Sequence, residues 1–194
     1  MARPIEHNPE DVIIKTMQLF WEQGYDNTSV QDIVKITGLK PGSLYNMYGN
    51  KDGIFKAVLE TYSRINTKHV KSILLKDDNA IKNIELFLNE IVVSTISNEN
   101  INGCLLVKTL LVLSPKDKSI QDSINKTFTE IEKMIEDVLK IAKENHTTTV
   151  DPYSFSKFIV STIYGAHVYY KANKDKKMLQ SSVDLILQML KDKR

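Results

Sequence analysis

Apolar residues recur every three or four positions along almost the whole chain, which is the spacing of one face of an α-helix. Glycine, proline, asparagine and aspartate mark the breaks between these periodic segments, and strand-like alternation does not compete with them. The pattern therefore predicts an all-α protein. Its first helix is predicted over residues 9–23, with Gly24 as a C-terminal stop.

Two short helices are predicted next. Thr28 or Ser29 can cap a helix that stops at Gly38. Pro41 suits the first turn of the following helix, because proline lacks the N–H group that would be unpaired there. Asn50 can then cap a fourth, longer helix.

The helical spacing continues to the end of the chain, and the total is nine predicted helices, three small and six larger. The segment Cys104–Leu113 is too apolar for a surface helix, so it is expected near the centre of a bundle. Apolar residues over 120–142 form one stripe along a long amphipathic helix. Two last helices are predicted over about Pro152–Ala172 and Lys176–Lys191.

The predicted third helix carries many groups that can form hydrogen bonds and few that can be buried. Its stretch, LKPGSLYNMYGNK, spans residues 39–51. At about 100° per residue, Leu44 and Tyr48 fall on one side of the helix. The opposite side carries Gly42, Ser43, Asn46 and Met47. Two short helices joined by a tight turn, with small and polar side chains on the second, are typical of a helix-turn-helix that enters the DNA major groove.

Several residues of this region have the chemistry for DNA contacts. Gly42 and Ser43 permit close approach to a phosphate backbone, whereas Asn46 can pair with an adenine and Lys40 with a guanine. Side chains placed to reach phosphate from outside the groove are Thr28, Ser29, Tyr45 and Lys51. Other interpretations stay open, because the two tyrosines can be core aromatics, the lysine a solvated charge, and the hydroxyl residues helix caps alone.

Charge and composition limit how extensive a DNA contact can be and where in the cell the protein is expected. The net charge is +2, and residues 1–60 hold six Lys/Arg against eight Asp/Glu, so any DNA contact must be local. No apolar run approaches the roughly 20 residues of a membrane span, so no membrane partner is expected. A single cysteine excludes an internal disulfide framework, and the first residues contain no apolar signal segment. A cytoplasmic protein is therefore expected.

The run TSVQDIVKITGLKPGSLYNMYGNKDGIF, residues 28–55, resembles the TetR (tetracycline repressor) family of bacterial regulators. The resemblance rests on an ordered series: Asp32-Ile33, Gly38-Leu39, Gly42, Leu44-Tyr45, Tyr48 where the family usually has Phe, and Lys51. Departures are Val34 and Thr37 in place of the usual Ala, and Met47 in place of a frequent His. The last of these puts one DNA contact in doubt.

The resemblance implies a nine-helix TetR-like architecture. A three-helix DNA-binding domain would occupy residues 1–50, and a six-helix ligand-binding and dimerisation domain residues 51–194. The implied function is a repressor homodimer released from its double-stranded, pseudo-palindromic operator by a small-molecule effector, with no cofactor. The implied base-facing residues are Lys40, Pro41, Gly42 and Asn46, and the implied backbone contacts are Thr28, Ser29, Ser43, Tyr45 and Lys51.

A small apolar or aromatic effector is expected near the start of the apolar segment at Cys104. Residues expected to line its site are Phe87, Cys104, Phe128, Tyr164 and His167. If Asn102 caps the helix, the Cys104 thiol lies in its first turn, where the helix dipole favours a thiolate. A small apolar core residue is the alternative for Cys104, and a core or interface residue is the alternative for His167.

Two apolar stripes on the last two helices suggest an isologous four-helix dimer interface. Their members are Phe155, Phe158, Ile159, Thr162, Ile163 and Ala166 on one helix, and Leu179, Val183, Ile186, Leu187 and Leu190 on the other. The alternative is that both stripes pack inside the monomer.

An enzyme is not expected, because the four histidines lie far apart and no metal-binding, phosphate-binding or nucleophile motif appears. A helical enzyme or small-molecule carrier that does not bind DNA is the alternative function. Whether a regulator of this kind represses or activates is not decided by these residues.

Overall fold

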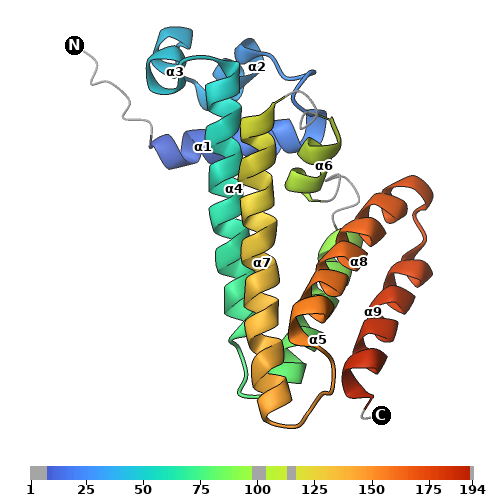
Figure 1. The fold of residues 1–194 in the computed structure, drawn as a ribbon. Coiled ribbons are helices and arrows are strands. Elements are labelled where there is room, and N and C mark those ends of the chain that lie inside the picture. Colours follow the sequence, from blue (N-terminus) through green and yellow to red (C-terminus); the bar gives the residue numbers. More distant parts are fainter. Residues whose placement is uncertain (1–7, 98–103, 113–116, 193–194) are drawn as a thin grey trace. The chain divides into compact units, whose positions relative to one another are not determined.

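The computed structural model describes residues 8–97, 104–112 and 117–192. These residues form nine α-helices and no strand, which confirms the predicted all-α architecture (Figure 1). The helices are α1 (Pro9–Gln23), α2 (Val30–Thr37), α3 (Pro41–Tyr48), α4 (Lys51–Leu74), α5 (Ala80–Ser97), α6 (Leu105–Val112), α7 (Lys118–Glu144), α8 (Pro152–Asn173) and α9 (Lys176–Lys191).

Contacts divide the chain into two compact units, Met1–Arg64 and Ile65–Arg194. Helix α4 contributes to both units, because the boundary falls within it. The first part of α4 belongs to the first unit through its apolar face, where Phe55 is 2% exposed and lies edge-on to Phe20 of α1, with ring centroids 4.8 Å apart. The first unit therefore includes the first part of α4 in addition to the three helices expected from the sequence.

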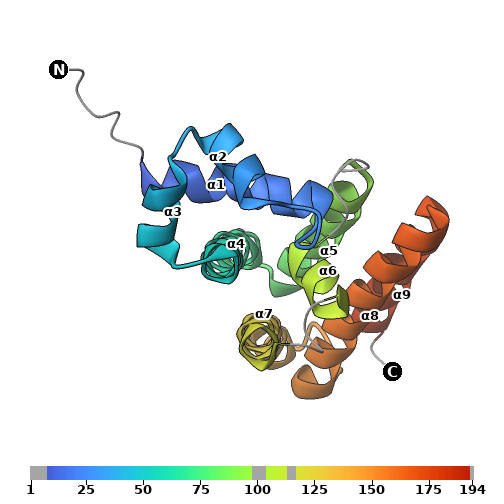
Figure 2. The same cartoon turned by 90° about the horizontal axis from the view of Figure 1, so that it is seen from above.

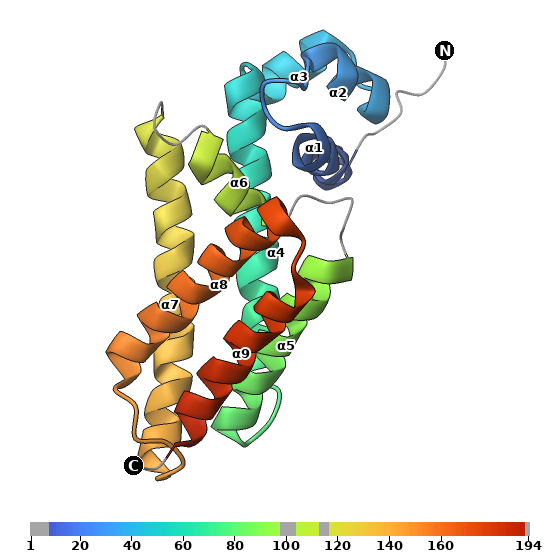
Figure 3. The same ribbon diagram turned by 90° about the vertical axis from the view of Figure 1, so that its right-hand side faces the viewer.

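The core of the second unit lies among α5, α7, α8, α9 and the last turns of α4. The apolar stripe predicted on α7 is buried there at Ile131, Ile135, Val138 and Ala142, whereas Phe128 is only half-buried. Helices α8 and α9 pack against each other and run antiparallel, as Figures 2 and 3 show. This packing accounts for the helical period of the sequence from residue 80 onward.

The prediction of a dimer interface from the two apolar stripes of α8 and α9 is wrong for most of their members. Eight of them belong to the core of the monomer: Phe155, Ile159, Ile163, Ala166, Leu179, Val183, Ile186 and Leu190. The core of this unit needs both stripes, because α8 packs on α7 and α9 packs on α5. Of the predicted set, Phe158 is an exception, with 38% of its surface exposed.

Helix α6 is buried at its beginning and exposed at its end. Leu105 and Leu106 are at most 1% exposed, whereas Leu111 is 62% and Val112 51% exposed. The prediction of a helix buried throughout is therefore wrong for its last turn. The Ser114-Pro115 stop and the Asn102 cap that the sequence suggested lie outside the described residues.

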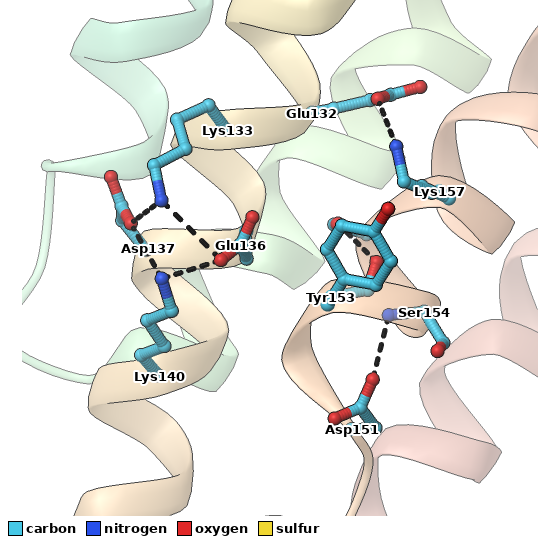
Figure 4. A network of polar contacts seen from close by, with 10 residues as sticks. Glu132, Lys133, Glu136, Asp137, Lys140, Asp151, Tyr153, Ser154 and Lys157 are labelled. Carbon is cyan, nitrogen blue, oxygen red and sulfur yellow. Dashed lines mark hydrogen bonds and ion pairs between the residues drawn. The ribbon is translucent and has the colours of Figure 1, made fainter.

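Ion pairs on the surface of α7 link it to itself and to α8 (Figure 4). Lys133 pairs with Asp137 at 3.1 Å, one helical turn away, and Lys157 of α8 pairs with Glu132 of α7 at 3.0 Å. Because these pairs lie at the surface, where water screens the charges, they contribute little to stability. Stability of the second unit therefore depends on its apolar core.

Replacing Ile135 by Ala should lower the free energy of unfolding of the second unit by about 2 to 5 kcal/mol, because the residue is 0% exposed and leaves a cavity. Urea unfolding followed by circular dichroism measures the change. The control is Ile141→Ala on the same helix, where the side chain is 47% exposed and a change of less than about 0.5 kcal/mol is expected. Equal losses for the two variants would contradict the assignment of the core.

Candidate functional site

Helix α2 is fixed at both ends by local hydrogen bonds. Ser29 caps its start, since the Ser29 hydroxyl accepts from the Asp32 N–H at 3.1 Å and the Asp32 carboxylate accepts from the Ser29 N–H at 2.9 Å. The Ser29 hydroxyl also donates to the Asp32 carboxylate at 2.6 Å, and this bond, followed by the one from the Ser29 N–H, holds the pKa of Asp32 below its ordinary value. At the other end Gly38 adopts a left-handed conformation with φ 73°, which favours glycine. The predicted cap and stop of this helix are both confirmed.

Helix α3 follows after a three-residue connection and buries one side chain. Leu44 is 0% exposed, and Leu39 just before the helix is 8% exposed. Pro41 is the first residue of the helix, as the sequence predicted. These apolar residues fix α3 in the first unit and leave the rest of its surface uncovered.

The other side of α3 is exposed. Tyr45 and Met47 are each 46% exposed, and Tyr48 is half-buried. The exposed residues also include most of the predicted DNA contacts: Lys40, Pro41, Gly42, Ser43 and Asn46. The structure therefore brings the predicted base-facing residues together on one surface, hereafter the α3 face.

Glycine at position 42 is not required by the fold. A Cβ atom built on Gly42 meets nothing within 4 Å. The residue lies near the start of a helix, and alanine has a higher helix propensity than glycine. Gly53 is different, because its Cβ would lie 1.8 Å from the carbonyl oxygen of Tyr48. Gly53 therefore permits the close approach of α4 to the end of α3, whereas Gly42 leaves open space on the α3 face.

The start of α4 lies beside a small polar cluster. The Asn50 side chain accepts from the N–H of Gly53 at 2.9 Å, which confirms it as a cap of α4. The ammonium nitrogen of Lys51 lies 4.1 Å from the ring centroid of Tyr25, and the hydroxyl of Tyr25 donates to Asp52. A cation held over an aromatic ring has fewer accessible orientations than a solvated lysine. Lys51 is therefore partly positioned before any ligand binds.

The prediction that Thr28 contacts phosphate does not fit its position. Thr28 is 0% exposed, and its hydroxyl donates to the carbonyl of Gly24 at 2.7 Å. Its neighbour Ser29 is exposed at the start of α2 and remains a candidate. The sequence alone did not separate the two, because both residue types cap helices.

The candidate effector residues do not form one cluster. Two of them are in ring contact, one is hydrogen-bonded to another helix, and one belongs to the core. The rings of Phe128 (α7) and Tyr164 (α8) lie 4.3 Å apart between centroids. Burial, followed by the charge of the Cys104 thiolate, raises the pKa of Tyr164 well above its ordinary value. Cys104 directly precedes α6 instead of lying in its first turn. Phe87 is buried at 4% exposure in the main core.

His167 forms the second group with Thr95, a residue that the sequence analysis missed. The Nδ1 atom of His167 on α8 lies 3.1 Å from the Thr95 hydroxyl on α5. Burial lowers the pKa of His167 to about 4, so the ring is neutral at physiological pH. Lys108 of α6 was also missed, although one charge within the apolar run LLVKTLLV was a visible signal.

The two ends of the chain match two parts of one known family. A model described as bacterial regulatory proteins of the tetR family matches residues 13–58. A second model, the C-terminal domain of LmrA/YxaF-like transcriptional regulators, matches residues 80–184, which is more than half of the chain. The chain belongs to the TetR family of transcriptional regulators. It is therefore a DNA-binding regulator rather than an enzyme.

Relatives of known sequence agree with this membership. The chain is 28% identical to the HTH-type transcriptional repressor ComR of Escherichia coli over 139 residues, which cover 71% of this chain and 66% of ComR. It is 24% identical over 188 residues to an uncharacterised HTH-type transcriptional regulator of Lactococcus lactis, encoded in the lacX 3′ region. That match covers 94% of this chain and 92% of the relative.

Solved structures share the same fold. The reduced form of NemR from E. coli superposes with a TM-score of 0.86 at 18% identity, covering 93% of this chain and 95% of NemR. A cysteine mutant of CifR in complex with 26-bp operator DNA superposes with a TM-score of 0.81 at 23% identity, covering 96% of this chain and 98% of CifR. Among the residues that the structure of the present chain describes, no helix is long and apolar enough to cross a membrane.

The two glycines near α3 should respond differently to alanine. Gly53→Ala should destabilise the first unit, because the new methyl group meets the Tyr48 carbonyl oxygen. Gly42→Ala should leave the melting temperature unchanged or slightly raised, since a helical glycine costs about 0.5 to 1 kcal/mol relative to alanine. Differential scanning calorimetry of both variants measures the effects. Equal destabilisation by the two substitutions would contradict the local geometry described here.

Proposed function

We propose that the protein is a homodimeric repressor that binds a pseudo-palindromic DNA operator through the α3 face and is released by a small effector. The observation that carries the proposal is an eight-residue helix that buries only Leu44 and exposes polar, small side chains on its other side. Such a helix contributes little to a core, and its free surface matches the needs of a recognition helix in the major groove. ComR and NemR are both described as transcriptional repressors, which supports repression rather than activation.

Within the α3 face, Asn46 and Lys40 are the proposed base readers. An asparagine amide matches the donor and acceptor of an adenine edge, and a lysine donates to guanine acceptors. Gly42 has no side chain and Pro41 has only a compact ring, so the backbone at the start of the helix can approach the DNA closely. The exposed Ser29, Ser43 and Tyr45, together with Lys51, are the proposed phosphate contacts.

Gel-shift titrations over a range of operator sequences test these roles. Asn46→Ala should cost about 1 to 3 kcal/mol on the preferred operator and relax the base preference at one position in each half-site. Lys51→Gln should weaken binding to all sequences alike and reduce the dependence of affinity on salt. Lys68→Gln, on the same helix as Lys51 but 17 residues further along, is the control and should leave DNA binding unchanged. If Asn46→Ala weakened every sequence equally, Asn46 would not read a base.

The surface proposed for the dimer contact is the exposed side of α8 and α9, on the other side of these helices from the core. On α9, Leu185 is 54% and Met189 41% exposed, and on α8 Tyr169 is 56% exposed. Gly165 lies at the middle of α8, is exposed, and has nothing within 4 Å of its Cβ position. A mid-helix glycine that gains nothing within the monomer is explained by close approach of a second copy.

Leu185→Glu should convert the dimer into a monomer, because it places a charge in the proposed apolar contact without disturbing the core. Size-exclusion chromatography with light scattering at micromolar concentration measures the molecular mass. The control is Ile141→Glu on α7, where a side chain of comparable exposure, 47%, lies outside the proposed surface. A wild-type monomer, or a Leu185→Glu dimer of unchanged stability, would contradict the proposed interface.

The proposed effector site lies around Cys104, Phe128, Tyr164 and His167 in the second unit. Its support is the contact between the Phe128 and Tyr164 rings, which suits a small apolar or aromatic molecule. Helix α4 is continuous from Lys51 to Leu74 and has residues in both units. We propose that effector binding shifts α4 and changes the separation of the two recognition helices in the dimer. A coupling free energy of about 1 to 3 kcal/mol would weaken operator binding 5- to 150-fold.

A further inference from the structure

Tyr25 follows α1 directly and is held in place by two buried aromatic rings. It stacks on Phe20 of α1, with ring centroids 6.0 Å apart and an angle of 11° between the ring planes. Its ring also lies 5.0 Å from that of Phe55 of α4, at an angle of 65°. Because Phe20 is 0% and Phe55 2% exposed, the half-buried Tyr25 is anchored to the core of the first unit. Packing therefore sets the orientation of its ring.

The anchored side chain of Tyr25 contacts both charged residues at the start of α4. The ammonium nitrogen of Lys51 lies 4.1 Å from the ring centroid, and the Tyr25 hydroxyl donates to the carboxylate of Asp52. Lys51 and Asp52 are consecutive in the chain, so their opposite charges would attract each other if both side chains turned freely. Tyr25 instead binds the cation at the face of its ring and the anion at its hydroxyl.

The carboxylate of Asp52 has opposite consequences for the fold and for DNA binding. It lies in the first turn of α4, where the helix dipole favours a negative charge. The same charge repels a DNA phosphate, and it competes with phosphate for the ammonium group of Lys51, the proposed phosphate contact. A hydrogen bond from a neutral hydroxyl restrains the carboxylate without using the lysine. Asp52 can thus serve the helix while Lys51 stays available.

We infer that Tyr25 is a positioning residue for DNA binding, which keeps the ammonium group of Lys51 available to phosphate by holding the carboxylate of Asp52 at its hydroxyl. Tyr25 acts through these two neighbours and makes no base contact of its own. The inference rests on the proposed function, because it explains how one of the proposed phosphate contacts is prepared before DNA arrives.

Gel-shift titrations of the full chain, with a DNA duplex that the wild-type protein selects from a random-sequence library, test the inference. Tyr25→Phe keeps the ring and removes only the hydroxyl. It should weaken binding about 3- to 10-fold, because the released carboxylate pairs with Lys51 in both subunits of the proposed dimer. The loss should shrink as the salt concentration rises, since salt screens exposed charges.

Asp52→Asn distinguishes this role from a purely structural one. The asparagine side chain still accepts a hydrogen bond from Tyr25 but carries no charge. In the Asp52→Asn protein, adding Tyr25→Phe should therefore leave the DNA affinity nearly unchanged, although it removes a hydrogen bond at the same place. Damage to the fold would instead cause the same loss of affinity in both backgrounds. Melting temperatures of all variants, measured by calorimetry, show any structural effect separately.

Tyr62→Phe is the matched control. It removes the hydroxyl of another tyrosine of the first unit, which lies on α4 with its ring 5.2 Å from that of Trp21. Its DNA affinity should equal that of the wild type.

The outcomes separate this inference from the proposed function. Wild-type affinity of Tyr25→Phe, an equal loss in the Asp52→Asn background, or a loss that does not shrink with salt would overturn the inference and leave the repressor standing. Failure of the wild-type protein to bind any duplex of the library would overturn the proposed function, and the inference with it.

Discussion

The burial of Leu44 is the constraint on which the DNA-binding part of the structure depends. This side chain is the single one that α3 buries, so it alone of the eight helical residues is committed to the core. Apart from the half-buried Tyr48, the remaining positions are therefore available for contacts outside the chain. The capping box of α2 and the left-handed Gly38 serve the same arrangement, because they fix where α3 begins.

In the second unit, α8 and α9 likewise have one buried face and one exposed face. One face of α8 and one of α9 complete a core shared with α5 and α7, and the opposite faces expose Tyr169, Leu185 and the open position at Gly165. A core face and a contact face on the same helix are what an assembly of two copies requires.

Most of the fold could be predicted from the sequence because its signals are local. The bounds of α1 and α9 follow from proline, glycine and aspartate at their ends, and the long stripe of α7 follows from its period. The partner of an apolar stripe is not a local property, so helical spacing does not distinguish the core faces of α8 and α9 from a dimer contact. In the same way, the pattern did not show that the end of α6 is exposed.

The candidate sites were predictable to different extents. The α3 face could be found because its residues are consecutive and their exposure follows from the helical period. Burial of Thr28 depends on packing and could not be read from its type, which is equally common at exposed caps. The pairing of His167 with Thr95 joins residues on two different helices, α8 and α5, which sequence spacing does not reveal.

Amide hydrogen exchange of the full chain, measured with and without bound operator DNA, tests the central claim most directly. We expect slowing of exchange to be concentrated in residues 40–47 and at the start of α4, because DNA bound at the α3 face would exclude water there. Unchanged exchange in residues 40–47, with slowing confined to α5–α9, would contradict the account.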